Sequence, residues 1–236
     1  MAGAGHELKL VGMWASPFVT RVKLALHLKG LSYDYVEEDL SSKSELLLSS
    51  NPVHKTVPVF IHGGRPVCES HIIVQYIDEA FVAAADGSPP LLPADPYERA
   101  TALFWAAYID DKVLKPWRRV FSARTGEERA EWMEQAVAAV DALEGVLAGS
   151  KEGGFFGGDS VGYVDVLLGG IVRWVHATAA ISGDELFDAA RTPLLAAWME
   201  RFGELDAAKA VFQDVDKVVD YAKMIMALFA AGSAAT

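Results

Sequence analysis

The sequence has a single cysteine and lacks any long uninterrupted apolar run. Cys68 has no partner for an internal disulfide, and no run reaches the roughly 18 residues of a membrane-spanning helix. The first ten residues lack the basic segment and apolar core of a secretory signal. Lys and Arg total 21 against 32 Asp and Glu, a net charge of −11. We therefore expect a soluble, cytosolic protein that binds neither nucleic acid nor a membrane.

The composition is that of a folded chain. Hydrophobic residues make up 52% and charged residues 22% of its 236 residues, which excludes disorder and permits one large or two small domains. The stretch DGSPPLLPADPYE holds four prolines in thirteen residues, which is typical of a domain boundary. We predict a first domain at residues 1–85, a linker at 86–96 and a second domain at 97–236.

The first domain alternates strand and helix patterns. After a period-two strand, helical spacing begins at Pro17, with Ser16 at the N-cap and Gly30 as the stop. The next strand is parallel to the first if a right-handed crossover joins them. A hairpin with a Gly63-Gly64 turn follows, and then a helix capped by Ser70. The predicted order is β-α-β then β-β-α, at residues 8–13, 17–29, 31–40, 57–61, 66–68 and 70–80.

The second domain contains almost no period-two pattern. Helical spacing recurs at residues 97–121, with a kink at Pro116, and at 127–147, 164–178, 193–202 and 215–229. In the first domain, Pro58 opens the hairpin, where a proline gives up a ladder hydrogen bond. Three explanations are open: an edge strand, a plain strand start, or a cis turn whose freed backbone faces a ligand.

Four short stretches carry a family resemblance across both domains. SPFVTRV, NPVHKTVPV, ESHIIVQYIDE and GGDSVGYVDV resemble the tau class of plant glutathione transferases, over roughly residues 6–220. The resemblance implies an α+β, thioredoxin-like N-terminal domain (βαβ-ββα) that binds glutathione as co-substrate. It also implies an all-helical C-terminal domain that lines a hydrophobic site, and a homodimer. The implied activity is conjugation of glutathione to hydrophobic electrophiles for detoxification, with glutathione peroxidase as a possible side activity.

The implied reaction needs the thiolate of glutathione. A free thiol with a pKa near ~8.5 is only a few per cent ionised at pH 7, and lowering this pKa by two units takes about 2.7 kcal/mol. A hydrogen bond from the Ser16 hydroxyl to the anion contributes roughly 1.5–3 kcal/mol. The positive end of the following helix adds about 0.3–1 kcal/mol. We therefore predict that Ser16 stabilises the thiolate and takes no proton; the alternative is a plain helix cap.

The resemblance also assigns the remaining site residues. Its glutathione contacts, besides Ser16, are Lys43, Lys55, Val57, Pro58, Glu69 and Ser70. Its contacts to the hydrophobic substrate are Trp14, Phe18, Tyr108, Asp111, Lys112, Trp174, Phe212 and Val215. For Trp105, Trp117 and Trp198 we prefer a place in the core. Asp165 resembles the capping aspartate of the family and is assigned to folding.

One position departs from the family pattern. Thr56 stands where many tau sequences have a second lysine, so either Lys55 reaches the glycyl carboxylate instead or one charge contact is missing. We predict weaker glutathione affinity. The six histidines are scattered, and we predict no metal site.

Two other functions compete with the transferase. A carrier of hydrophobic plant metabolites would use the same wide pocket without turnover. A thiol-disulfide reductase would need Cys68 as its reactive thiol, because serine stands at the start of the first helix.

Overall fold

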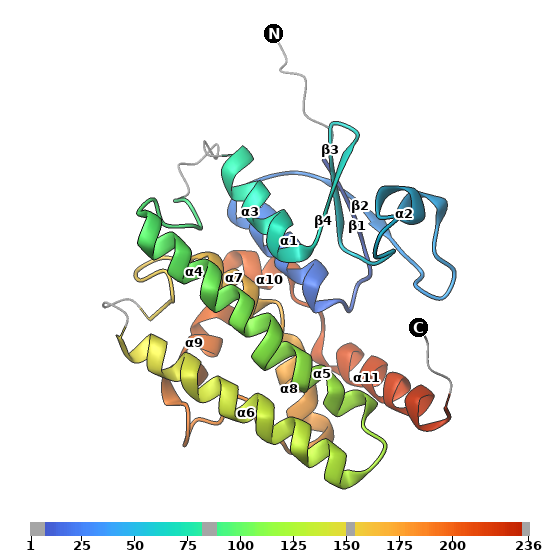
Figure 1. The fold of residues 1–236 in the computed structure, drawn as a ribbon, viewed down its shortest axis with the longest axis vertical. Coiled ribbons are helices and arrows are strands. Elements are labelled where there is room, and N and C mark those ends of the chain that lie inside the picture. Colours follow the sequence, from blue (N-terminus) through green and yellow to red (C-terminus); the bar gives the residue numbers. More distant parts are fainter. Residues whose placement is uncertain (1–7, 82–88, 150–153, 233–236) are drawn as a thin grey trace. The chain divides into compact units, whose positions relative to one another are not determined.

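The computed structural model describes residues 8–81, 89–149 and 154–232 (Figure 1). The chain divides into two compact units, Met1–Pro90 and Leu91–Thr236. Each unit buries its own set of apolar side chains.

The first unit is built on a four-stranded mixed sheet. The strands lie in the order β2-β1-β3-β4, with β1 parallel to β2 and antiparallel to β3. This confirms the predicted β-α-β then β-β-α order and the parallel first pair. The elements are β1 (Leu8–Gly12), α1 (Pro17–Leu28), β2 (Asp34–Glu37), α2 (Glu45–Ser50), β3 (Val59–His62), β4 (Arg65–Cys68) and α3 (Ser70–Ala80).

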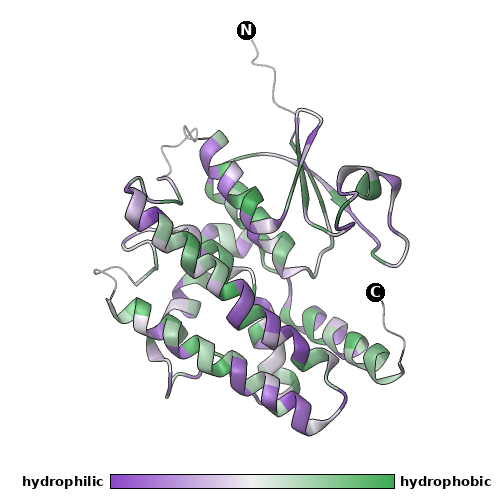
Figure 2. Cartoon of the chain, in the orientation of Figure 1, coloured by the Kyte–Doolittle hydropathy of each residue, from purple (hydrophilic) through white to green (hydrophobic). Residues whose placement is uncertain are grey.

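Helix α1 packs closely against the end of β1. A Cβ atom at Gly12 would lie 2.7 Å from Cγ1 of Val19, so the helix approaches the strand at a distance that only glycine allows. Ser16 is the N-cap and Pro17 the first helical residue, as predicted, and Gly30 follows the helix with a φ of 62°. In Figure 2 both hydrophobic residues, in green, and hydrophilic residues, in purple, are seen along α3, the helix that packs with α1.

The hairpin begins later than predicted. Strand β3 starts at Val59 because Pro58 has no N–H to contribute to the ladder. Gly63 and Gly64 form the turn, both with positive φ. Ser70 is the first residue of α3 and not its cap; the N-cap is Glu69.

The sequence analysis missed helix α2. Its six residues are too few to show a period, and serines flank its leucines. Ser44 caps it by accepting a hydrogen bond from the Leu47 amide, and the buried Leu47 side chain packs with Val11 and Val59. Tertiary packing therefore holds this helix more than its own propensity does.

The regular elements found among the described residues of the second unit are helices, with one isolated β-bridge between Phe155 and Gly158. The helices are α4 (Pro96–Tyr108), η1 (Ile109–Leu114), α5 (Lys115–Ser122), α6 (Gly126–Gly149), α7 (Tyr163–Gly169), α8 (Val172–Ser182), α9 (Pro193–Gly203), α10 (Asp206–Val211) and α11 (Val215–Ala230). These agree with the predicted helical stretches, with three exceptions. Helix α10 was not predicted, the stretch at 97–121 is not uniformly α-helical, and the stretch at 164–178 is divided into α7 and α8.

A π-helical segment stands where the kink was predicted. In a regular α-helix, the ring of Pro116 would clash with the carbonyl of Lys112, and proline has no N–H to donate to that carbonyl. The six residues of η1 directly precede α5, in which Pro116 lies in the first turn. The wider π turn relieves the clash, so the chain continues as a helix instead of bending sharply.

Residues Tyr163–Ser182 are long and apolar enough to cross a membrane, by length and composition alone. In the structure this segment comprises α7 and α8, and 72% of the apolar stretch is buried inside the protein. Such burial is typical of the core helices of a globular domain.

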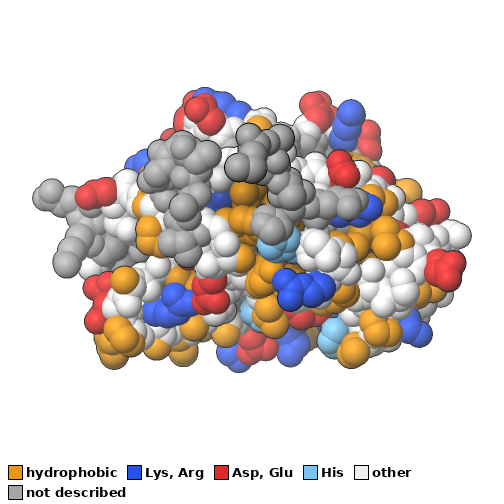
Figure 3. All heavy atoms as spheres, turned by 90° about the horizontal axis from the view of Figure 1, so that it is seen from above, with side chains coloured by type: hydrophobic (Ala, Val, Ile, Leu, Met, Phe, Trp, Pro, Cys, Tyr) orange, Lys and Arg blue, Asp and Glu red, His pale blue; other side chains and the backbone are white. Residues whose placement is uncertain are grey.

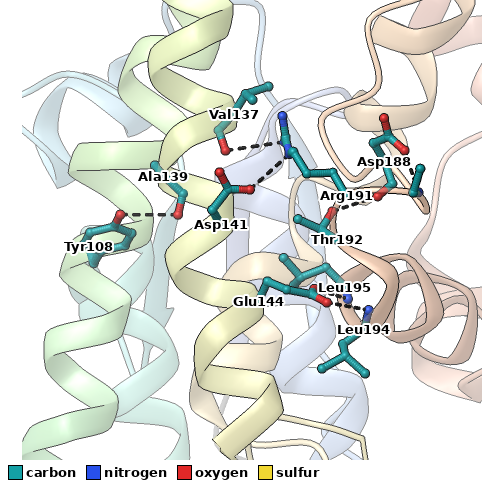
Figure 4. A network of polar contacts seen from close by, with 11 residues as sticks. Tyr108, Val137, Ala139, Asp141, Glu144, Asp188, Arg191, Thr192, Leu194 and Leu195 are labelled. Carbon is teal, nitrogen blue, oxygen red and sulfur yellow. Dashed lines mark hydrogen bonds and ion pairs between the residues drawn. The ribbon is translucent and has the colours of Figure 1, made fainter.

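Polar contacts join α6 to the start of α9 (Figure 4). The Glu144 carboxylate accepts hydrogen bonds from the amides of Leu194 and Leu195, both at 2.9 Å. Arg191 forms an ion pair of 3.0 Å with Asp141. Glu144 thereby caps the first turn of a helix that is distant in sequence, because the amides there have no partner within their own helix.

The carboxylate of Asp165 is the most highly connected buried group of the second unit. It accepts hydrogen bonds from the amides of Phe156, Gly157 and Gly162 and from the Trp198 indole, at 2.8–2.9 Å. Burial raises the pKa of this carboxyl, and the four donors oppose that rise. Asp165 thus caps α7 and fastens the preceding loop to α9, as the assignment to folding requires.

We expect Asp165→Ala to lower the free energy of unfolding by about 3–5 kcal/mol, because it leaves four N–H donors without an acceptor, and those of Gly162 and Trp198 are buried. Urea unfolding followed by circular dichroism measures this change. The control is Asp159→Ala, an exposed position in the same loop, which should change stability by no more than about 0.5 kcal/mol. Equal effects of the two substitutions would contradict the role of Asp165.

Candidate active site

The hydroxyl oxygen of Ser16 is held by a hydrogen bond, whereas its hydrogen is available. Its side chain is 7% exposed, and its Oγ accepts a hydrogen bond of 3.3 Å from the Val19 amide. A hydroxyl has one hydrogen to donate, and among the described residues no group accepts the hydrogen of Ser16. The side chain therefore caps α1 through its oxygen, and its hydrogen is available to a further acceptor.

Ser70 repeats this arrangement at the start of α3. The residue is 5% exposed, and its Oγ accepts a hydrogen bond of 3.2 Å from Nη1 of Arg21. The N-cap, Glu69, has a φ of 70°, which is uncommon for a residue other than glycine, and its side chain makes no capping bond. The Glu69 carboxylate is exposed and lies 3.8 Å from His54. An anion at this helix start would meet the Ser70 hydroxyl and the freed amides.

Arg21 is the residue of this region that the sequence analysis missed. It is fully buried on α1, and its guanidinium lies 5.2 Å from the centre of the Phe18 ring. Phe18, Leu24 and Ala25 lie one helical turn away from Arg21 on α1. Apolar residues at this spacing could have predicted that Arg21 is buried. Through its bond to Ser70, Arg21 places a positive charge behind the start of α3.

The peptide bond between Val57 and Pro58 is cis. Of the three explanations for Pro58, the cis turn is therefore the one that the structure adopts. Val57 is half-buried and packs against Val11, Leu47 and Val59.

The lysines assigned to the glycyl carboxylate lie on the loops around α2. Lys43 is half-buried just before that helix, and among the described residues no hydrogen-bond or ion-pair partner is found for it. Lys55 is exposed with a φ of 53°. Thr56 is also exposed, and its carbonyl accepts a hydrogen bond of 2.9 Å from Asn51.

The residues assigned to the hydrophobic substrate have varied surroundings. In the first unit, Trp14 and Phe18 are half-buried on either side of Ser16. In the second, the Tyr108 hydroxyl donates to the Ala139 carbonyl at 3.3 Å. Asp111 and Lys112 are exposed and form an ion pair of 2.9 Å with each other.

The other assigned residues of the second unit lie on or near α8 and α11. Trp174 is 8% exposed, and its ring contacts those of Trp117, Phe121 and Tyr221. Phe212 lies 4.8 Å from the Arg173 guanidinium, and Val215 begins α11. The preference for core packing is confirmed for Trp117 and Trp198, whereas Trp105 is half-buried.

Cys68 does not have the surroundings of a reactive thiol. It lies at the end of β4, where its Sγ donates to the Ser50 carbonyl at 3.6 Å. Burial, and the negative charge of Glu69, raise the pKa of the thiol above its usual value. A raised pKa leaves less thiolate at neutral pH and disfavours disulfide exchange. Over residues 8–81, 89–149 and 154–232, no group of three His, Cys, Asp or Glu side chains is arranged to hold a metal ion.

This mixed βαβ-ββα sheet unit, followed by a helical unit, is the architecture of the glutathione transferases. The sequence family model of the glutathione S-transferase N-terminal domain matches residues 6–79. The family model of the C-terminal domain matches residues 126–201. The chain therefore belongs to the glutathione S-transferase family, and within it to the tau class.

Plant relatives resemble the chain over nearly its whole length. A protein named "probable glutathione S-transferase GSTU6" from Oryza sativa subsp. japonica is 55% identical, over 96% of this chain and 97% of the relative. The crystal structure of a tau class glutathione S-transferase from mango, Mangifera indica, is 40% identical, with a TM-score of 0.83 over 93% of this chain and 98% of that one. The structure of a rice glutathione transferase in complex with glutathione is 37% identical, with a TM-score of 0.84 over 95% of this chain and 98% of that one.

We expect Cys68 to react slowly with iodoacetamide at neutral pH, because its thiol pKa is raised. Below the pKa, the alkylation rate rises about tenfold per pH unit. The rate for Cys68 should thus keep rising at alkaline pH values where the rate for N-acetylcysteine has levelled off. Mass spectrometry follows the reaction without ambiguity, since the chain has one cysteine. Saturation of the rate near pH 7 would contradict the raised pKa.

Proposed function

We propose that the protein conjugates the thiolate of glutathione to hydrophobic electrophiles, with glutathione bound to the first unit. The observation that carries this proposal is the Ser16 hydroxyl, whose oxygen is held by the Val19 amide while its hydrogen is available. The thiolate attacks an electrophilic carbon, and the leaving group departs with the bonding pair. Glutathione peroxidase chemistry is a side activity of the same nucleophile. The thiolate attacks a peroxide oxygen, the O–O bond breaks, and the leaving oxygen takes a proton; a second glutathione then converts the sulfenic acid to glutathione disulfide and water.

Ser16 acts on the thiol as a hydrogen-bond donor. Lowering the pKa of the thiol by two units takes about 2.7 kcal/mol. A hydrogen bond to the sulfur anion supplies roughly 1.5–3 kcal/mol, and the start of α1 adds about 0.3–1 kcal/mol. The sum is sufficient without a general base.

The chain carries a net charge of −11, and acidic and basic side chains are interspersed on the face drawn in Figure 3. Binding of an anion therefore depends on local groups.

The local groups for the γ-glutamyl end of glutathione are at the start of α3. Its carboxylate accepts hydrogen bonds from the Ser70 hydroxyl and amide, and its ammonium group pairs with Glu69. The buried charge of Arg21, 3.2 Å from the Ser70 oxygen, supports this assignment because it favours an anion beside that hydroxyl.

The remaining glutathione contacts involve the loops around α2. The backbone of Val57, before the cis Pro58, pairs with the cysteinyl part, and Lys43 and Lys55 attract the glycyl carboxylate. Lys43 is half-buried and, among the described residues, no hydrogen-bond or ion-pair partner is found for it, which supports its part. The assignment of the hydrophobic substrate to Trp14, Phe18, Tyr108, Asp111, Lys112, Trp174, Phe212 and Val215 rests on the family resemblance.

We also propose a cytosolic homodimer with a role in detoxification. On α4, Tyr97 is 81% exposed and Phe104 is 59% exposed, two helical turns apart on one face. Exposed aromatic pairs of this kind are typical of protein interfaces. The raised pKa of the Cys68 thiol argues against a thiol-disulfide reductase.

We expect Ser16→Ala to raise the pKa of bound glutathione by about 1–2 units, the equivalent of one charge-assisted hydrogen bond. Because less thiolate is then present below the new pKa, turnover of chlorodinitrobenzene should fall about 10–100-fold near pH 6.5 and recover at alkaline pH. Initial rates measured across about pH 6–9 give the two pKa values.

Asp95→Ala is the matched control, because it removes a helix cap from α4 and leaves Ser16 intact. It should lower stability without moving the pH profile. If Ser16→Ala turns over as fast as the wild-type protein at every pH, the thiolate mechanism is wrong. If neither protein turns over and apolar dyes bind tightly, the carrier function is favoured instead.

We expect Thr56→Lys to lower the KM for glutathione about two- to fivefold, since an exposed lysine there adds one attraction to the glycyl carboxylate. The gain should shrink as salt is added, because exposed charges are screened. Thr56→Gln, which adds length without charge, is the control. If the KM for glutathione falls equally in both variants, or if its fall does not depend on salt, the proposal that a charge contact is missing at Thr56 is wrong.

A further inference from the structure

Two adjacent glutamates at the end of β2 point to opposite faces of the sheet. Side chains alternate along a strand, so Tyr35 and Glu37 share one face, and Val36 and Glu38 share the other. Val36 packs against the apolar cluster that contains Leu47 of α2. The amide of Glu38 continues the pairing of the strand by donating to the Gly12 carbonyl at 2.7 Å. The two carboxylates therefore reach two different loops from one point of the chain.

Glu37 holds the loop that leads to Ser16. Its Oε1 accepts a hydrogen bond of 2.9 Å from the amide of Trp14, two residues before Ser16. Its Oε2 accepts a hydrogen bond of 2.7 Å from the Tyr35 hydroxyl. The ammonium group of Lys23, on α1, lies 3.6 Å from the centre of the Tyr35 ring. The loop before α1 and the helix itself are thus both tied to the end of β2.

Glu38 holds the loop that carries Lys43. Its carboxylate accepts from the Ser44 amide at 2.5 Å and from the Ser44 hydroxyl at 2.8 Å. Glu38 is only 4% exposed, and Ser44 is also the N-cap of α2. A buried carboxylate with two donors on one residue leaves that residue little freedom. Lys43, directly before Ser44, is therefore held at its backbone.

We propose that Glu37 and Glu38 are positioning residues that set the two ends of the glutathione site independently. Glu37 places the Ser16 hydroxyl for the thiol, and Glu38 places Lys43 for the glycyl carboxylate. This inference rests on the proposed binding of glutathione. It predicts that the two substitutions have different effects: loss of Glu37 alters the ionisation of the thiol, and loss of Glu38 alters the affinity for glutathione. General damage to the fold would not produce this difference.

The first test is Glu37→Ala, which frees the Trp14 amide. We expect the pKa of bound glutathione, followed by the ultraviolet absorbance of the thiolate, to rise by about 0.5–1 unit, while the Kd for glutathione changes less than about twofold. Glu37→Gln keeps an oxygen that accepts from the amide and should restore most of the thiol pKa. The control is Asp34→Ala, at the exposed start of the same strand, which should change neither quantity.

The second test is Glu38→Gln, with calorimetric binding of glutathione and of γ-glutamylcysteine, which lacks the glycyl carboxylate. We expect the Kd for glutathione to rise about five- to tenfold, with an unchanged thiol pKa and an unchanged Kd for the dipeptide. In a Lys43→Ala background, Glu38→Gln should have no further effect. Ser44→Ala, which removes one of the two hydrogen bonds, should act in the same direction, and Glu45→Ala is the exposed control.

The outcomes separate the two proposals. If the wild-type protein does not bind glutathione, both this inference and the proposed function are wrong. If it binds and the glutamate variants behave like their controls, only the positioning role is wrong. Equal losses of affinity for glutathione and the dipeptide in Glu38→Gln and Ser44→Ala would likewise overturn it.

Discussion

The close packing of α1 against the end of β1 is the constraint on which the rest of the first unit depends. Gly12 permits it, since any side chain there would collide with Val19. The chain must then turn within a few residues from strand to helix, and Ser16 occupies the last position before the helix begins. The first-turn amides of α1 and the serine hydroxyl consequently face the same side. A longer or looser connection would separate the hydroxyl from the helix start, and their effects on an anion would no longer add.

The hydroxyl groups of two buried serines are held in the same way. Ser16 and Ser70 each accept a hydrogen bond from the protein, one from a helix amide and the other from a buried guanidinium. A hydroxyl that is already held as an acceptor can rotate its hydrogen toward only a few directions, so it is preorganised as a donor. Such preorganisation suits a protein of negative net charge, because attraction of an anion has to come from a few fixed dipoles and the buried guanidinium of Arg21.

Part of the site could be predicted from local patterns. The cap at Ser16 followed by Pro17, the glycine turn of the hairpin and the helix after Glu69 all depend on residues close in sequence, which is why their positions were found. Arg21 and Glu37 were missed because each bonds to a residue that the fold brings close: Ser70 is 49 residues from Arg21, and Trp14 is 23 residues from Glu37. Glu38 was missed although Ser44 is six residues away, because the loop between them has no periodic pattern. Helix α2 was missed because packing of Leu47, and not a period, stabilises it.

The sequence alone determined the order of the four strands and of the longer helices, the start of α1 and, through four short stretches, the family. These depend on periodicity, caps and turn residues, which act over a few positions along the chain. Only the tertiary structure decided which charges are buried, which amides the glutamates hold and how Pro116 is accommodated within a helix. Those outcomes depend on which residues the fold brings within hydrogen-bond distance. A local sequence pattern does not predict such distances.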